Sequence, residues 1–217
     1  MDGADRVMLQ ISRAHYPITT LGPGRRVGIW TQGCTLACPG CISRDTWAPD
    51  GGWSADVSDL IEWVEAEAPE ADGITITGGE PFQQPEALAA LLDGLRDMRP
   101  DRDILAYSGY TLPWLQRRRA EVLAKLDAVI SAPFREGQPT DLVWRGSGNQ
   151  PLTPLSALGR RRFAPYVDAT RDQPEMQFRI SGETVWIVGI PPRGALDRVV
   201  AACASEGVAF KEVSWSA

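Results

Sequence analysis

Three short, mainly apolar segments in the first half of the chain are each followed by a loop and by a stretch with helical spacing of its apolar residues. The segments are residues 27–31, 73–77 and 104–107, and a fourth lies at 128–131. This alternation predicts an α/β fold with parallel strands and helices on the outer face of the sheet. A doubly wound sheet and an incomplete β/α barrel both have this pattern, and both place functional residues at the carboxyl ends of the strands.

Helices are expected at 54–69, between Pro85 and Pro100, and at 112–126. Ser54 is a candidate N-cap of the first. Polar and apolar residues alternate over 6–19, which predicts a strand at the edge of the sheet. Residues 133–170 read as irregular. A hairpin at 176–180 and 184–188, a helix at 196–204 and a strand at 208–213 complete the chain. We therefore expect a core at 1–158 and a small α+β appendage at 159–217.

Composition places the chain among globular proteins, with 217 residues, 43% hydrophobic and 23% charged. The net charge of −6 gives no general electrostatic attraction to nucleic acid or to an anionic membrane. There is no apolar run of membrane-spanning length and no apolar segment of a signal peptide at the N-terminus. These features predict a cytoplasmic protein. The single histidine, His15, argues against a Ser-His-Asp triad and against metal sites with several histidines.

Three cysteines, Cys34, Cys38 and Cys41, are clustered as C-x3-C-x2-C after the first predicted strand. Thiolates suit zinc, copper(I) and iron-sulfur clusters, and a reducing cytoplasm argues against disulfides. Structural zinc needs a fourth ligand, for which His15 and Cys203 are the candidates. Three thiolates can instead leave one iron of a four-iron cluster open to a small chelating molecule. We expect Cys203 to lie on a helix as a buried, apolar residue.

The segment Cys34 to Cys41 resembles the cluster loop of the radical SAM superfamily. Further motifs are similar to those of the activating enzymes of anaerobic ribonucleotide reductase: residues 22–26 (GPGRR), Thr46-Trp47, 78–81 (GGEP), 108–110 (SGY) and 144–150 (WRGSGNQ). Ser43 and Ser131-Ala132 depart from the family pattern.

The resemblance implies an incomplete β/α barrel, a [4Fe-4S] cluster on the three cysteines and reductive cleavage of S-adenosylmethionine (SAM) to a 5′-deoxyadenosyl radical. It also implies a glycyl radical enzyme as partner, with an electron donor such as flavodoxin or ferredoxin. A radical SAM enzyme acting on a peptide or small metabolite is the second hypothesis. A non-catalytic, zinc-stabilised binding module is the third.

Several polar or small residues at predicted strand ends are candidates for contacts with SAM. The two glycines of the 78–81 motif would let the backbone approach the methionyl amino group of SAM. The glutamate of the motif would accept a hydrogen bond from that group. Trp47 would shield the cluster from solvent. No residue is assigned as catalytic. The candidate SAM residues are Gly78, Gly79, Glu80, Ser108, Tyr110, Arg145, Ser147 and Asn149.

Overall fold

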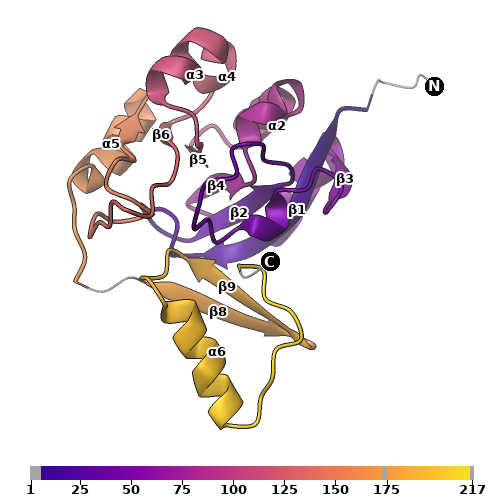
Figure 1. Cartoon of the computed structure of the whole chain (residues 1–217). Coiled ribbons are helices and arrows are strands. Elements are labelled where there is room, and N and C mark those ends of the chain that lie inside the picture. The colour runs from indigo at the N-terminus through magenta and orange to yellow at the C-terminus, as the bar shows by residue number, and fades with distance from the viewer. Residues whose placement is uncertain (1–5, 173–174, 216–217) are drawn as a thin grey trace.

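The structure, a computed structural model, describes residues 6–172 and 175–215 (Figure 1). Its centre is a seven-stranded sheet in the order β3-β1-β2-β4-β5-β6-β7, and β8 and β9 form a separate two-stranded sheet. The strands are β1 (Met8–Ile18), β2 (Arg26–Thr31), β3 (Trp53–Asp56), β4 (Gly73–Gly78), β5 (Asp103–Tyr107), β6 (Ala128–Ile130), β7 (Leu152–Pro154), β8 (Met176–Ser181) and β9 (Thr184–Gly189).

The helices are α1 (Val57–Glu67), α2 (Pro85–Met98), α3 (Leu112–Arg118), α4 (Ala120–Leu123), α5 (Ala157–Phe163) and α6 (Ala195–Ser205). Short 3-10 turns are η1 (Arg44–Thr46), η2 (Pro81–Gln83) and η3 (Ala164–Tyr166). None of the helices in the described part of the chain is long and apolar enough to cross a membrane.

The middle of the large sheet is parallel, as the sequence predicts. Strands β2, β4, β5 and β6 pair in parallel, whereas β1, β3 and β7 join in antiparallel fashion. The four parallel strands lie in chain order. A doubly wound sheet reverses its strand order at a switch point, and the described strands contain no such reversal. The fold is therefore mixed α/β, with a mostly parallel central sheet whose parallel strands follow one another in chain order.

One face of the sheet packs against α1 to α4 and holds the main core. Ile29, Ile74 and Ile76 point to this face and are fully or almost fully buried. The leucines of α2 recur at helical spacing, so they all turn toward the strands. Burying each such side chain contributes about 1.5–3 kcal/mol. These four leucines are Leu88, Leu91, Leu92 and Leu95.

The opposite face, here called the inner face, carries Trp30, Leu105 and Tyr107, whose strand positions alternate with those of the main core. Helix α5 covers part of it through the buried Phe163. The hairpin β8–β9 lies on the side of the large sheet away from α2, α3 and α4 (Figure 1). It reaches the inner face through Val188.

Two predictions near the N-terminus are wrong. Residues 6–19 do form a strand, but it is not at the edge of the sheet, because Trp53–Asp56 extends and pairs with Met8–Ile11. Ser54 therefore lies in β3 and does not cap the following helix. Asp56 is the N-cap, and its carboxylate accepts a hydrogen bond from the Ser58 backbone at 2.9 Å.

The other differences lie later in the chain. The helix predicted at 112–126 is interrupted at Arg119, whose φ of −142° is not helical, so that Val122 and Leu123 can reach the core. The segment 133–170, predicted as irregular, contains β7 and α5. The hairpin and α6 are confirmed, whereas 208–213 forms no strand, because its backbone finds no neighbouring strand among the described residues.

Candidate functional site

The cysteine loop begins at the carboxyl end of β2, where the strand order predicts function. Backbone hydrogen bonds close its base: Gly33 N–H donates to Thr46 O at 2.8 Å, and Cys34 N–H donates to Trp47 O at 3.0 Å. The Gln32 side chain adds bonds to two further carbonyls of the returning segment. The Trp47 ring lies beneath the Arg44 guanidinium, 5.2 Å from centroid to Cζ. The loop is therefore held at its two ends, with the cysteines between them.

The thiols of Cys34, Cys38 and Cys41 are half-buried and free of disulfides. Burial raises the pKa of Cys34, and the nearby Cys41 and Glu80 raise it further, whereas backbone N–H groups of the loop lower it. Burial is also the main cause that raises the pKa of Cys38, opposed by a hydrogen bond from the Phe134 backbone. Burial therefore favours the protonated thiols of Cys34 and Cys38, and a metal ion that binds them must displace their protons.

The donor set fits an iron-sulfur cluster. Backbone N–H donors to cluster sulfurs are a normal part of such sites, and the loop already directs N–H groups toward two of the thiols. Among the described residues, no three His, Cys, Asp or Glu side chains are gathered as ligands of one metal ion. His15 lies on β1 opposite Gly28, and Cys203 lies on α6. Neither candidate fourth zinc ligand is grouped with the three cysteines.

Glu80 follows β4 and is the most enclosed carboxylate beside the cysteine loop, with 1% of its surface exposed. It accepts hydrogen bonds from Phe82 N–H (3.1 Å), Ser108 Oγ (2.9 Å) and Gly109 N–H (2.7 Å). Burial raises its pKa to about 7, even though these hydrogen bonds lower it. Glu80 therefore ties the ends of β4 and β5 together, and the structure brings the predicted residues Glu80 and Ser108 into contact.

Gly78 and Gly79 allow β4 to approach β2 and the cysteine loop. Gly78 has a φ of +100°, and a Cβ there would lie 2.7 Å from backbone atoms of Thr31. A Cβ on Gly79 would lie 2.3 Å from the Gly33 carbonyl oxygen. No side chain fits at either distance, so both glycines have a packing role that the sequence argument did not foresee.

Gln83 is a site residue that the sequence analysis missed. Its amide donates to Thr35 Oγ1 (2.7 Å) and to Tyr110 Oη (3.1 Å), and its Oε1 accepts from Thr35 N–H (3.2 Å). It therefore links the cysteine loop to the predicted residue Tyr110, whose ring stacks on Trp114 at 3.8 Å. The only sequence signal was its place just after the 78–81 motif.

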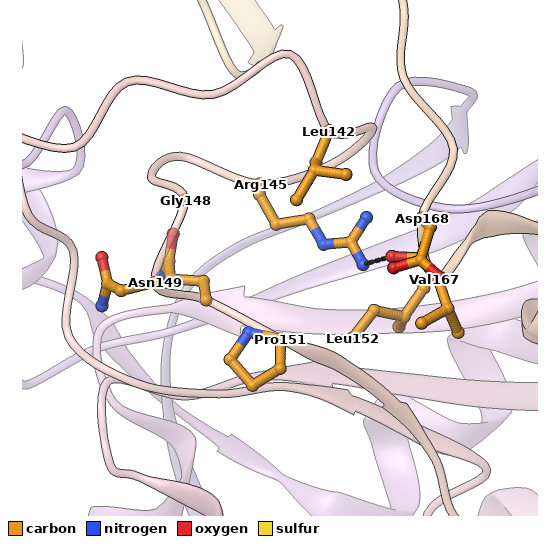
Figure 2. Close-up of a pocket in the computed structure, with 9 residues that line it drawn as sticks. Leu142, Arg145, Gly148, Asn149, Pro151, Leu152, Val167 and Asp168 are labelled. Carbon is orange, nitrogen blue, oxygen red and sulfur yellow. Dashed lines mark hydrogen bonds between the residues drawn. The ribbon is translucent and has the colours of Figure 1, made fainter.

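Arg145 lines a pocket of about 330 Å³ together with residues 142, 148–152, 167 and 168 (Figure 2). The residue is 2% exposed, and its guanidinium donates to the carbonyls of Val143, Tyr166 and Val167. Burial lowers its pKa. These bonds fasten the 143–150 segment to the end of η3.

Ser147 and Asn149 hold the neighbouring 133–135 segment. Ser147 Oγ accepts from Arg135 N–H at 3.0 Å, and Asn149 Nδ2 donates to Pro133 O at 2.8 Å. Because Phe134 between them hydrogen-bonds to Cys38, the 144–150 motif supports one wall of the cysteine loop.

Comparison with known proteins defines the class. Residues 20–153 match the model of a family described as "4Fe-4S single cluster domain". The chain belongs to this family of iron-sulfur proteins.

Several curated relatives share one name, anaerobic ribonucleoside-triphosphate reductase-activating protein. The chain is 31% identical to that of Haemophilus influenzae over 143 residues, which is 63% of this chain and 92% of the relative. It is 31% identical to that of phage T4 over 134 residues (60% and 85%). It is 29% identical to that of Escherichia coli K12 over 143 residues (63% and 93%).

Proposed function

We propose that this protein is a radical SAM activating enzyme that generates a glycyl radical on a partner of the anaerobic ribonucleotide reductase type. The observation that carries the proposal is the buried Glu80 beside the loop that holds the three free cysteines, where it is close enough to raise the pKa of Cys34 and of Cys38. The names of the relatives support it. The one-directional order of the parallel strands supports the incomplete barrel that the resemblance implies.

In this proposal Cys34, Cys38 and Cys41 bind three irons of a [4Fe-4S] cluster and leave the fourth iron to SAM. When bound and reduced, the cluster supplies the electron that cleaves the sulfonium of SAM. The loop contributes thiolates and backbone N–H groups, which set the charge around the cluster. Flavodoxin or ferredoxin is the proposed class of electron donor.

Glu80 is the proposed acceptor for the amino group of SAM. A carboxylate has about four acceptor positions, and three are used by protein donors. A hydrogen bond from the amino group of SAM would favour the ionised form of Glu80 and lower its pKa. Ser108 and Gly109 fix the orientation of the carboxylate, and Gln83 holds Tyr110 beside the loop.

The remaining candidates are assigned more indirect roles. Gly78 and Gly79 set how closely β4 approaches the cysteine loop. Arg145, Ser147 and Asn149 hold the 133–150 segment over the same end of the sheet, where it can close on SAM or meet the partner. We retain the division into a core (1–158) and an extension (159–217) as part of the proposal.

The test is radical transfer to the reductase. The reconstituted protein is mixed anaerobically with SAM, a reductant and an anaerobic ribonucleotide reductase from the same source, and electron paramagnetic resonance is recorded. A glycyl radical signal that requires both proteins supports the proposal. Cleavage of SAM without any radical on the reductase would instead favour a peptide or small metabolite as hydrogen donor.

A further inference from the structure

Arg13 lies on the inner face of the sheet because the pairing of β1 with β2 is irregular at this point. Ile11 pairs with Thr31, and Arg13 pairs with Trp30. Two residues of β1 therefore advance against one of β2, which is the count of a β-bulge. Ile11 is buried in the main core, and without the bulge a side chain two positions later would point the same way. The bulge directs Arg13 to the inner face instead.

Two indole rings fix the position of the Arg13 guanidinium. Its Cζ lies 5.9 Å from the centroid of the Trp30 ring and 5.4 Å from that of the Trp186 ring. Trp30 is 7% exposed and belongs to β2, the strand that leads into the cysteine loop. Trp186 belongs to β9. Indole is the aromatic group that attracts a cation most strongly, so side chains from both sheets hold the guanidinium in place.

The hairpin that carries Trp186 is firmly attached to the large sheet. The Gln177 side chain accepts a hydrogen bond from Thr19 N–H at 3.2 Å and donates one to Pro17 O at 2.7 Å. Val188 is 6% exposed and packs on the inner face. Figure 1 shows β9 beneath β1 and β2. Trp186 therefore approaches Arg13 from a fixed support.

At its far end, Arg13 binds the segment that follows the cysteines. We call residues 42–48 the return segment. Arg13 Nη2 lies 2.5 Å from Asp45 Oδ2, and the two side chains are 21% and 30% exposed. The Gln32 amide donates to the carbonyl of the same aspartate at 3.1 Å. Asp45 is thus held through its backbone and through its side chain, a short distance along the chain from Cys41.

The ion pair connects parts of the chain that lie far apart in the sequence. Arg13 and Trp186 both lie outside residues 20–153, which match the iron-sulfur family, whereas Asp45 lies inside them. A partly exposed ion pair adds little to the stability of a whole protein. Its effect is therefore expected where it acts, on the position of the return segment.

We propose that Arg13 is a positioning residue of the cluster site, which holds the return segment against the sheet, and that Trp186 of the extension positions Arg13. In the protein with its cluster, this contact would keep the Cys41 side of the loop in place. Arg13 and Asp45 would also shift the reduction potential of the cluster with opposite signs, because nearby charge affects that potential. The inference rests on the proposed function for the identity of the cluster. The hold on the return segment rests only on the contacts of Arg13.

The first readout is amide hydrogen exchange, measured by NMR on the full chain without a cluster. The reporters are the N–H groups of Thr46 and Trp47, which donate to carbonyls of the same turn. Arg13→Gln should make both exchange roughly fivefold faster, because loss of the ion pair raises the population of the locally open state. Arg13→Lys keeps a cation beside Asp45 and should retain most of the protection. Unchanged protection in Arg13→Gln would overturn the proposal.

Arg25→Gln is the matched control. Arg25 lies 5.4 Å from the Tyr16 ring and pairs with Glu70 at 4.0 Å, so its substitution removes the same two kinds of contact just before the start of β2, at the end away from the cysteine loop. Thr46 and Trp47 should exchange as in the wild type. The same acceleration as in Arg13→Gln would overturn the proposal, because it would show a general loosening of the fold.

Two further variants separate the parts of the contact. Trp186→Ala should accelerate the same exchange by a smaller factor, whereas Phe178→Ala, which removes a 48% exposed ring from the same hairpin, should leave it unchanged. Equal exchange in these two variants would overturn the role of Trp186. If Arg13→Gln does not fold, Asp45→Asn breaks the same pair from its more exposed side, and it must accelerate the exchange for the proposal to stand.

The second readout is the midpoint potential of the reconstituted cluster, from a redox titration followed by electron paramagnetic resonance. Arg13→Gln should move the potential to a more negative value and Asp45→Asn to a less negative one, because they remove opposite charges. Shifts in the same direction, or none, would overturn the effect of the pair on the cluster. If the wild type assembles no four-iron cluster, the proposed function is rejected, while the exchange measurement still decides whether Arg13 holds the return segment.

Discussion

The pH dependence of stability provides a direct measure of how Glu80 is buried. Its pKa is raised by burial from the ordinary value of 4.5 to about 7. Between these values the native state binds more protons than the unfolded chain, so stability is lost as pH rises through this window. Applied to both pKa values, this linkage predicts that Glu80 alone lowers the free energy of unfolding by about 2–3 kcal/mol between pH 5 and pH 8.

Glu80→Gln removes the titration. Unfolding by urea is measured for both proteins without ligand, under reducing conditions, at several pH values from 5 to 8. The variant also alters the hydrogen bonds to Ser108 and Gly109, but this contribution varies little with pH. The free energy of unfolding of the wild type should therefore fall by about 2–3 kcal/mol relative to that of the variant over this range. A difference that stays constant with pH would refute the reasoning, because it would mean that Glu80 is ionised throughout.

Two further substitutions test the framework of the site. Gly79→Ala should destabilise the protein by about 1–3 kcal/mol, because its Cβ would lie 2.3 Å from the Gly33 carbonyl oxygen; an unchanged urea midpoint would contradict the close approach. Asp103→Asn should cost about 3–5 kcal/mol, because it leaves a buried guanidinium without its charged partner. Asp103 pairs with Arg26 at 2.6 Å and both side chains are fully buried, so thermal unfolding close to the wild type would rule out a structural role for this pair.

The elements that were predicted correctly are those with a strong local signal. Ile74 and Ile76 lie in a β-branched run bounded by glycines, and Leu88 and Leu91 recur at helical spacing, so β4 and α2 follow from the sequence. Short strands have no such signal. Residues 152–154 form β7 because they pair with the free edge of β6. Residues 53–56 form β3 because they pair with β1. The tail at 208–213 has the strand pattern, but no strand lies beside it in the described part of the chain.

The same limit applies to the site. The spacing of Cys34, Cys38 and Cys41 identifies the loop by itself, because adjacent residues along the chain carry the information. The link through Gln83 from the cysteine loop to Tyr110 depends on three segments meeting in space, and a single sequence gives no sign of it. The packing role of Gly79 likewise depends on how closely two strands approach.

The central claim is that the three cysteines hold a cluster that cleaves SAM. The most direct measurement is anaerobic reconstitution with iron and sulfide, reduction with dithionite, addition of SAM, and quantification of iron and 5′-deoxyadenosine, with Cys38→Ala and Cys203→Ala alongside. The account predicts about four irons per chain and product for the wild type and Cys203→Ala, and loss of both for Cys38→Ala. Stoichiometric zinc without product, or normal iron and SAM cleavage in Cys38→Ala, would contradict it.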